Sequence, residues 1–209
     1  MPESKAEKKR PHLVLGLAGG IGSGKSAVAA ALEKDFAFLW INADRIAREE
    51  LESETLRPEL ERRFGPEIFS EQGHLDRQRL ADLVFADEER RKELEGLVHP
   101  ATRKRIRGCL AEAAANGQRA LLDVPLLFEG GLGELCDLVL FVDCPERLRR
   151  ERAVARGMRS EDWARREAQQ MPVAEKRRRA ELVVDNSGTL EELRARLAEL
   201  RPVLIPTAS

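Results

Sequence analysis

Short apolar runs alternate with longer amphipathic stretches along most of the chain. The apolar runs lie at residues 12–18, 36–41, 120–127, 138–144 and 182–184. Those at 120–127 and 138–144 lack polar alternation, as expected of strands that helices cover on both faces. Strands that alternate with helices predict an α/β fold with a parallel sheet flanked by helices.

The stretches between these runs predict helices. Helices are expected at residues 25–35, 76–85 and 87–115, in the stretch that ends at Arg63, and from a capping box at residues 189–192 to just before Pro202. Pro58 is expected to break the stretch that ends at Arg63. The pair His99-Pro100 is expected to interrupt the helix at 87–115, because proline removes a helix hydrogen bond and clashes with the preceding turn.

Length and charge limit the classes of protein that fit. A chain of 209 residues buries one good core, and 36 basic against 37 acidic side chains give no reason to expect nucleic acid as a partner. Three irregularly spaced cysteines suit neither a disulfide framework nor a tetrahedral metal site. The chain shows no apolar run of membrane-spanning length and no secretory signal, so we expect a cytoplasmic protein without a membrane partner.

The sharpest motif follows the first apolar run. Residues 19–26, which we call the phosphate loop, read Gly-Gly-Ile-Gly-Ser-Gly-Lys-Ser and match G-x-x-x-x-G-K-[ST] between a predicted strand and a predicted helix. Glycines allow backbone amides to converge on phosphate oxygens, and the helix adds its positive end. Lys25 is expected to bridge the β- and γ-phosphates of ATP, and the Ser26 hydroxyl to bind Mg²⁺. The motif therefore predicts binding of a nucleoside triphosphate.

Three classes of phosphate-loop protein compete for this chain. A GTPase needs an Asn-Lys-x-Asp element, which the sequence lacks, and large ATPases usually exceed this length. The arginine-rich residues 145–180, which we call the lid segment, lie between the last two predicted strands. Compact kinases carry there a lid that closes over the phosphates, so a small-molecule kinase is favoured.

Several further stretches resemble the dephospho-CoA kinase family. They are residues 16–26, 42–48, 73–77, 99–100, 123–129 and 184–188, within a resemblance that covers most of residues 13–195. The His99-Pro100 pair and the Asp-Val-Pro-Leu-Leu-Phe-Glu run at 123–129, in this order, are specific to the family. The resemblance implies a phosphate-loop kinase that transfers the γ-phosphoryl group of ATP to the ribose 3′-hydroxyl of dephospho-CoA. The products are CoA and ADP, in the last step of CoA synthesis.

The resemblance also implies how the chain is divided. A kinase domain is expected at residues 12–201, with a helical, substrate-binding insert on the CoA side at 45–117 and the lid segment at 145–180. Residues 1–11 are expected to form a disordered basic tail, and residues 202–209 a C-terminal tail. No obligate protein partner is implied.

Roles for single residues follow from the same resemblance. ATP is expected to contact Gly20, Ile21, Gly22, Ser23, Gly24, Lys25, Ser26, Ala27, Asn186 and Gly188. The residues expected to take part in catalysis are Lys25, Asp44, Arg152 and Arg156, with Asp44 as the base. Ser26 and Asp123 are expected to bind the metal. The residues expected to bind the substrate are Asp44, Arg48, His99 and Leu126.

Structural interpretations stay open for several of these residues. Asp44 and Asp123 can be plain caps, and Asn186 with Gly188 an ordinary turn. The arginines of the lid segment can form a solvated helix face, and His99 can mark a helix break.

The sequence departs from the family pattern at several positions. Asn42 replaces the first aspartate of the family's Asp-Ala-Asp, and Ala27 replaces a threonine. In the lid segment, Arg149 and Gly157 replace the glutamine and aspartate that flank the two arginines of the pattern. Two alternatives therefore stay open: another small-molecule kinase that acts on a nucleoside or a sugar, and an ATP-binding protein that has lost catalysis.

Overall fold

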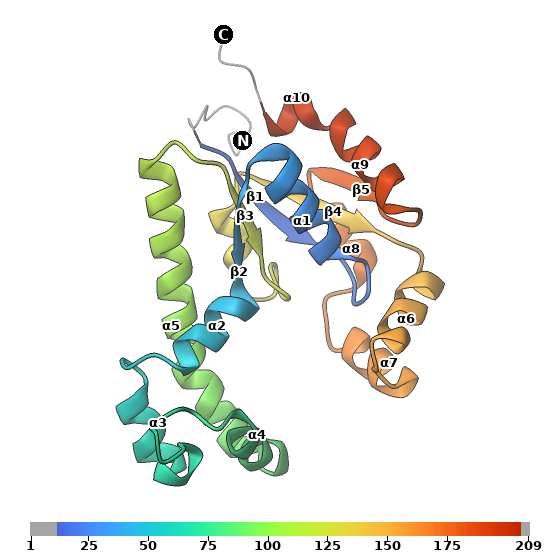
Figure 1. Ribbon diagram of the computed structural model, residues 1–209. Coiled ribbons are helices and arrows are strands. Elements are labelled where there is room, and N and C mark those ends of the chain that lie inside the picture. The colour runs from blue at the N-terminus through green and yellow to red at the C-terminus, as the bar shows by residue number, and fades with distance from the viewer. Residues whose placement is uncertain (1–11, 206–209) are drawn as a thin grey trace, which may run out of the picture. The chain divides into compact units, whose positions relative to one another are not determined.

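A computed structural model describes residues 12–205 of the chain (Figure 1). The predicted tail at residues 1–11 and residues 206–209 of the predicted C-terminal tail lie outside the described residues. The described chain forms two compact units. The first contains the residues up to Asn42 and those from Leu110 on, and the second is Ala43–Cys109.

A parallel sheet forms the centre of the first unit. Its strands are β1 (Val14–Ala18), β2 (Leu39–Asn42), β3 (Ala120–Asp123), β4 (Leu138–Asp143) and β5 (Leu182–Asp185). Their order across the sheet is β2-β3-β1-β4-β5, and every pairing is parallel, which confirms the predicted α/β fold.

The start of β2 and the end of β3 differ most from the apolar runs that predicted these strands. β2 begins at Leu39 because Phe36 still belongs to the preceding helix and Ala37 turns the chain with φ 56°. β3 ends at Asp123 because Pro125, which has no backbone N–H, cannot continue a central strand.

The carboxyl ends of all five strands lie at one edge of the sheet. Asn42 at the end of β2 is in register with Asp123 at the end of β3, and Asp143 of β4 is in register with Asp185 of β5. Ligands of open α/β sheets bind outside this edge. The polar strand ends therefore mark where the site of the first unit is built.

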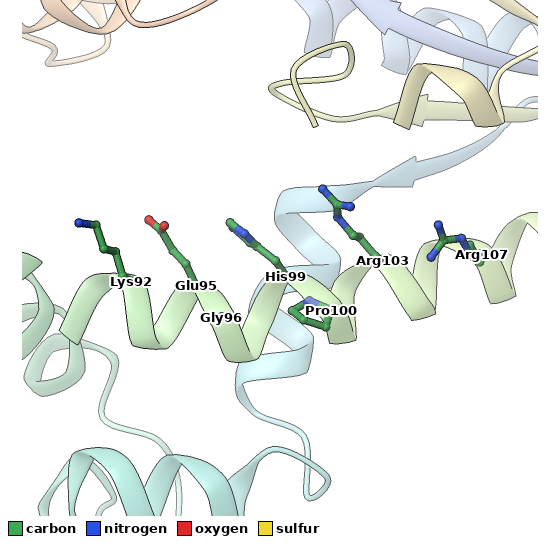
Figure 2. A pocket seen from close by; sticks show the side chains of 7 residues that line it. All are labelled: Lys92, Glu95, Gly96, His99, Pro100, Arg103 and Arg107. Carbon is green, nitrogen blue, oxygen red and sulfur yellow. The ribbon is translucent and has the colours of Figure 1, made fainter. Parts of the chain in front are cut away.

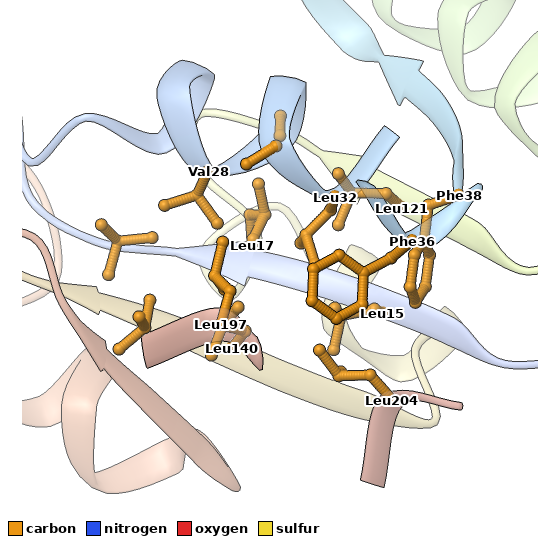
Figure 3. Close-up of a cluster of buried hydrophobic side chains, with 14 of the residues drawn as sticks. Leu15, Leu17, Val28, Leu32, Phe36, Phe38, Leu121, Leu140, Leu197 and Leu204 are labelled. Atoms are coloured by element: carbon orange, nitrogen blue, oxygen red, sulfur yellow. The ribbon is translucent and has the colours of Figure 1, made fainter. Parts of the chain in front are cut away.

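The main core of the first unit joins the sheet to α1 (Lys25–Phe36), α9 (Leu190–Glu199) and α10 (Arg201–Leu204) (Figure 3). Thr189 and Glu192 form the predicted capping box at the start of α9. α10 reaches into the stretch predicted as a tail. Leu204 is fully buried in the core, so the chain stays packed to that residue.

The lid segment folds into three short helices between β4 and β5. They are α6 (Glu146–Ala155), α7 (Ser160–Ala168) and α8 (Val173–Arg179). The buried Lys176 of α8 pairs with Glu129 at 3.0 Å, and Glu129 also accepts a hydrogen bond from the backbone of Met171. These contacts tie the lid segment to the loop after β3, which contains the 3₁₀ turn η3 (Leu132–Leu135).

The second unit is helical. It contains α2 (Ala43–Leu51), α3 (Arg57–Phe64), the 3₁₀ turn η2 (Pro66–Ile68), α4 (Arg77–Ala86) and most of α5 (Glu88–Ala115). Its core is a cluster around Leu60, Phe64, Ile68, Leu80 and Val98. Across all the helices that the structure describes, none combines the length and the apolar character needed to cross a bilayer.

Of two predictions about prolines, one was confirmed and one was wrong. The stretch that ends at Arg63 is broken before Pro58, between α2 and α3, and Pro58 lies in the first turn of α3, where its missing N–H costs no hydrogen bond. Pro100 does not interrupt α5, which runs unbroken from Glu88 to Ala115. α5 tolerates the proline because a single missing hydrogen bond is outweighed by the packing of Val98 and Ile106 on either side of it.

Candidate active site

The phosphate loop connects β1 to α1, as its motif predicted. Gly22 and Gly24 adopt φ values of 80° and 89°, in the region that glycine adopts without strain. Lys25 is the first residue of α1, and the Ser26 side chain beside it is exposed. Ala27 follows in the first turn and donates its backbone N–H to Gly24. The start of α1 is thus open to an anion.

Neighbouring elements also require the loop glycines. A Cβ atom on Gly22 would lie 2.1 Å from the carbonyl oxygen of Arg149, and one on Gly24 would lie 2.2 Å from Asn186 Nδ2. Any larger residue would push α6 or the loop after β5 away from the phosphate loop. The two glycines therefore serve close packing as well as backbone curvature.

Lys25 lies against the loop that it is expected to serve. Its Nζ donates to the carbonyl oxygens of Gly19 at 3.1 Å and Gly20 at 3.3 Å. Burial lowers the pKa of Lys25, while the negative charge of Asp123 opposes that shift. The ammonium is thus held inside the loop, where a phosphate oxygen can replace a carbonyl oxygen as its partner.

Asn42 is a partner of Asp123. Its Nδ2 donates to Asp123 Oδ2 at 3.3 Å, and Trp40 Nε1 donates to the same oxygen at 3.3 Å. Asp123 is buried, and an aspartate at position 42 would set a second carboxylate against it. The amide of Asn42 therefore stabilises the buried charge of Asp123. This contact gives a physical reason why asparagine replaces the family's aspartate at position 42, which the sequence alone did not reveal.

The oxygen donors present suit magnesium. The Ser26 hydroxyl and the Asp123 carboxylate are hard ligands of the kind that Mg²⁺ prefers. Within residues 12–205, no group of three or more His, Cys, Asp or Glu side chains forms a metal cage. This donor set matches the way Mg²⁺ binds at kinase sites, through one or two protein oxygens together with substrate phosphates and water.

Asn186, which follows β5, contacts the phosphate loop, and Arg152 of α6 contacts Asn186. Asn186 is buried and donates from Nδ2 to the carbonyl oxygen of Ser23 at 2.7 Å. Arg152 Nη1 donates to the Asn186 carbonyl oxygen at 2.9 Å. Arg156 is exposed at the end of α6. A side chain at position 188 would collide with Glu192, because a Cβ on Gly188 would lie 1.8 Å from a carboxylate oxygen of Glu192.

A second group of contacts on the loop was not predicted as part of the site. Glu167 Oε2 accepts a hydrogen bond from the backbone N–H of Ile21 at 3.1 Å. Arg149 Nη1 pairs with Glu167 Oε1 and also donates to the Ile21 carbonyl oxygen. Trp163 Nε1 donates to the same carbonyl oxygen of Ile21. Arg149 stood out in the sequence only as a departure from the family pattern. No signal pointed to Glu167 or Trp163, which lie more than 140 residues from Ile21 along the chain.

Three of the predicted substrate residues belong to the second unit. Asp44 and Arg48 are exposed on α2, and Asp44 is the second residue of that helix and not its N-cap. His99 is exposed on α5. The fourth predicted residue, Leu126, belongs to the first unit and is 42% exposed after β3.

His99 lies in a groove along α5 with a volume of about 610 Å³ (Figure 2). We call it the α5 groove; it is lined by Lys92, Glu95, Gly96, His99, Pro100, Arg103 and Arg107. Its charged side chains extend to the same side of the helix, and cations outnumber the single acid. A groove of this charge suits an anionic ligand.

Comparisons with known proteins agree with this site. A family model described as dephospho-CoA kinase matches residues 13–192. Dephospho-CoA kinase of Thermobifida fusca is 43% identical over 90% of this chain and 94% of its own length. The crystal structure of TT1252 from Thermus thermophilus superimposes with a TM-score of 0.73 at 39% identity, covering 95% of this chain and 99% of that one.

A second solved structure supports the fold. Dephospho-CoA kinase from Campylobacter jejuni superimposes with a TM-score of 0.70 at 22% identity over 93% of this chain and 98% of that one. The family model covers most of the chain, and the phosphate loop lies where such a kinase needs it. This chain therefore belongs to the dephospho-CoA kinase family.

Proposed function

We propose that this chain transfers the γ-phosphoryl group of ATP to the 3′-hydroxyl of dephospho-CoA. The observation that carries the proposal is the phosphate loop, with Lys25 and Ser26 at the sheet edge, in a chain whose family match spans residues 13–192. That match favours dephospho-CoA over the nucleoside or sugar acceptors that the sequence left open. The three free cysteines of the described residues suit a reducing compartment, and we place the reaction in the cytoplasm.

The phosphate loop and its neighbours are proposed to hold ATP. Backbone amides of residues 20–27 and the Lys25 ammonium bind the phosphates, with Arg152 and Arg156 joining from α6. Asn186 and Gly188 face the adenine. Ser26 and Asp123 would hold Mg²⁺ together with phosphate oxygens, and that ion would neutralise charge on the β- and γ-phosphates.

Asp44 is proposed as the base. The 3′-hydroxyl oxygen attacks the γ-phosphorus, the bond from that phosphorus to the β,γ-bridging oxygen breaks, and ADP leaves. The hydroxyl proton passes to the Asp44 carboxylate, which also orients the nucleophile. Support comes from the exposure of Asp44 and from its position two residues after β2, whose end is in register with Asp123.

The α5 groove is proposed to bind the diphosphate of dephospho-CoA. His99 and Arg103 lie at its centre, flanked by the cations Lys92 and Arg107. Arg105 of α5, between Arg103 and Arg107 in sequence, pairs with Glu49 and Glu50 of α2 at 3.4 Å each. These pairs connect the groove helix to the helix that carries Asp44 and Arg48. Leu126 is proposed to contact the apolar part of the substrate.

The proposal is tested by measuring ADP release with Mg²⁺-ATP and three acceptors: dephospho-CoA, adenosine and gluconate. We expect turnover with dephospho-CoA only, with CoA identified as the product by mass and by its 3′-phosphate. Lys25→Ala should abolish turnover, because the loop then lacks the cation that bridges the β- and γ-phosphates. Turnover with another acceptor at a higher kcat/KM would contradict the proposal.

A further inference from the structure

The contact between Glu167 and the phosphate loop brings a carboxylate to a backbone amide of the nucleotide site. Glu167 Oε2 accepts the Ile21 N–H at 3.1 Å, and its other oxygen pairs with Arg149. A carboxylate presents two negatively charged oxygens to its donors, as a phosphate group does. Glu167 thus makes, from within the chain, the interactions that an ATP phosphate makes with a loop amide and an arginine.

The arginine in this pair is built into the site. The Arg149 side chain is 5% exposed, its guanidinium lies over the Trp163 ring at 5.4 Å, and a Cβ on Gly20 would lie 2.2 Å from its Nη1. Its Nε atom is buried and has no hydrogen-bond partner among the described residues. A buried guanidinium needs a negative partner, because an unpaired buried charge is strongly destabilising.

The Ile21 amide and Arg149 are the groups for which Glu167 and the proposed ligand compete. That ligand, a triphosphate, is negatively charged, as Glu167 is. When the triphosphate enters, its oxygens compete with Glu167 for the Ile21 amide and for Arg149. A ligand that must displace such a contact binds with an affinity reduced by the fraction of protein in the open state. Arg149 keeps a negative partner in either state, whereas Glu167 must leave the loop.

We infer that Glu167 is a stand-in for an ATP phosphate: it holds α7 on the nucleotide-free phosphate loop, through Ile21 and Arg149, until the triphosphate displaces it. The inference rests on the proposed binding of ATP by this loop. It makes Glu167 and Arg149 positioning residues of the nucleotide site and gives α7 a closed state that nucleotide opens.

The test compares Glu167→Gln with Glu161→Gln. Glu161 lies on the same helix, is 78% exposed and pairs only loosely with Arg159 at 3.8 Å, so it controls for the loss of one negative charge. Binding of the non-hydrolysable analogue AMP-PNP with Mg²⁺ is measured by calorimetry. We expect Glu167→Gln to lower the dissociation constant about three- to tenfold relative to Glu161→Gln, because the closed state loses its anchor.

Hydrogen exchange supplies a second measurement. In the absence of nucleotide, peptides of residues 160–168 should exchange faster in Glu167→Gln than in wild type, while peptides of α9 stay unchanged. Unchanged or weaker AMP-PNP binding by Glu167→Gln would overturn the inference, because the contact would then only support the loop. Glu167→Asp, which keeps the charge but is a methylene shorter, repeats the test with less risk to folding and should also bind AMP-PNP more tightly.

A Lys25→Ala variant separates the two hypotheses. If wild type binds AMP-PNP no better than Lys25→Ala, the proposed function fails and the inference falls with it. If wild type binds through Lys25 but Glu167→Gln and Glu161→Gln behave alike, only the inference fails.

Discussion

Asp44 is the residue on which the proposed chemistry depends most. Phosphoryl transfer requires little covalent work from the protein, so a carboxylate that orients the hydroxyl and takes its proton is the principal chemical contribution expected of the chain. Asn42 cannot replace Asp44 as the base, because an amide takes up no proton in the pH range in which a carboxylate does. In addition, Nδ2 of Asn42 already donates to Asp123.

We therefore expect Asp44→Asn to lower kcat at least about a hundredfold, since general-base assistance is typically worth 10² to 10⁴ in rate. The affinity for ATP should stay within about a few-fold of wild type, because the nucleotide contacts proposed above do not involve this side chain. Steady-state kinetics and calorimetry with AMP-PNP measure the two effects. A variant with wild-type kcat would assign the base to another group.

The amide at position 42 provides a second test at the residue scale. Asn42→Asp would place a second carboxylate against Asp123 Oδ2, and the repulsion should raise the pKa of one of the pair. A raised carboxyl pKa makes the folded state bind more protons than the unfolded state, so stability should fall as pH rises through that pKa.

The measurement for Asn42→Asp is thermal unfolding at pH 5 and pH 8. We expect the variant to lose about 1 to 2 kcal/mol relative to wild type, with the larger loss at pH 8. Mg²⁺ should restore part of the stability lost at pH 8, because a bound cation reduces the repulsion between the two carboxylates. Equal unfolding temperatures for variant and wild type at both pH values would show that Asn42 and Asp123 do not interact through charge.

At the scale of elements, α5 presents two sides of different character. One side carries the buried Val98, Thr102 and Ile106, at helical spacing, and another side forms the α5 groove. Gly96 lies in the groove, and no atom lies within 4 Å of a Cβ built there. Since Pro100 has no N–H to donate to the Gly96 carbonyl, the groove also offers a backbone acceptor at this point.

Gly96→Ala should separate stability from binding. Alanine in place of a helical glycine stabilises by roughly 0.5 to 1 kcal/mol, and the added methyl group would narrow the groove. We expect a higher unfolding temperature together with a several-fold higher KM for dephospho-CoA and an unchanged KM for ATP. Gly108→Ala, at an equally open position of α5, is the matched control and should raise stability without changing KM. Equal effects of the two variants on KM would exclude the groove from substrate binding.

The lid segment combines a helix that packs on the phosphate loop with many exposed arginines. α6 packs on the phosphate loop, as shown by the close approach of Gly22 to the backbone of Arg149, whereas Arg156 and many other arginines of the segment face solvent. Exposed arginines on short helices beside a phosphate site are suited to close over a bound triphosphate.

At the scale of the whole molecule, we expect limited proteolysis between residues 145 and 180 to slow markedly when AMP-PNP and dephospho-CoA are both present. AMP-PNP alone should instead speed cleavage within residues 160–168, because it displaces Glu167 and releases α7 from the phosphate loop. The arginines find their full set of anionic partners only in the ternary complex. Peptide mapping by mass spectrometry locates the cuts. Cleavage at the same rate with and without both ligands would count against a closing lid.

The sequence by itself determined what depends on neighbours along the chain. The spacing of glycines, Lys25 and Ser26, the capping box at Thr189, and the apolar runs are local patterns, and the phosphate loop, the start of α9 and the five strands follow from them. The resemblance to the family followed from the same local motifs. The break at Pro58 was predicted correctly, because a proline is favoured in the first turn of a helix. The break at Pro100 was predicted wrongly, because packing along α5 outweighs the cost of the proline.

Only the tertiary structure decided which distant side chains meet. Asn42 reaches Asp123 because β2 and β3 are paired in register, although 81 residues separate them along the chain. Glu167 reaches Ile21 across 146 residues because α7 folds back onto the phosphate loop. Neither pairing has a signature in local spacing, since a hydrogen bond between distant residues depends on how whole elements pack. These contacts convert a phosphate-binding motif into a site with a stabilised buried carboxylate and a carboxylate already seated on the loop.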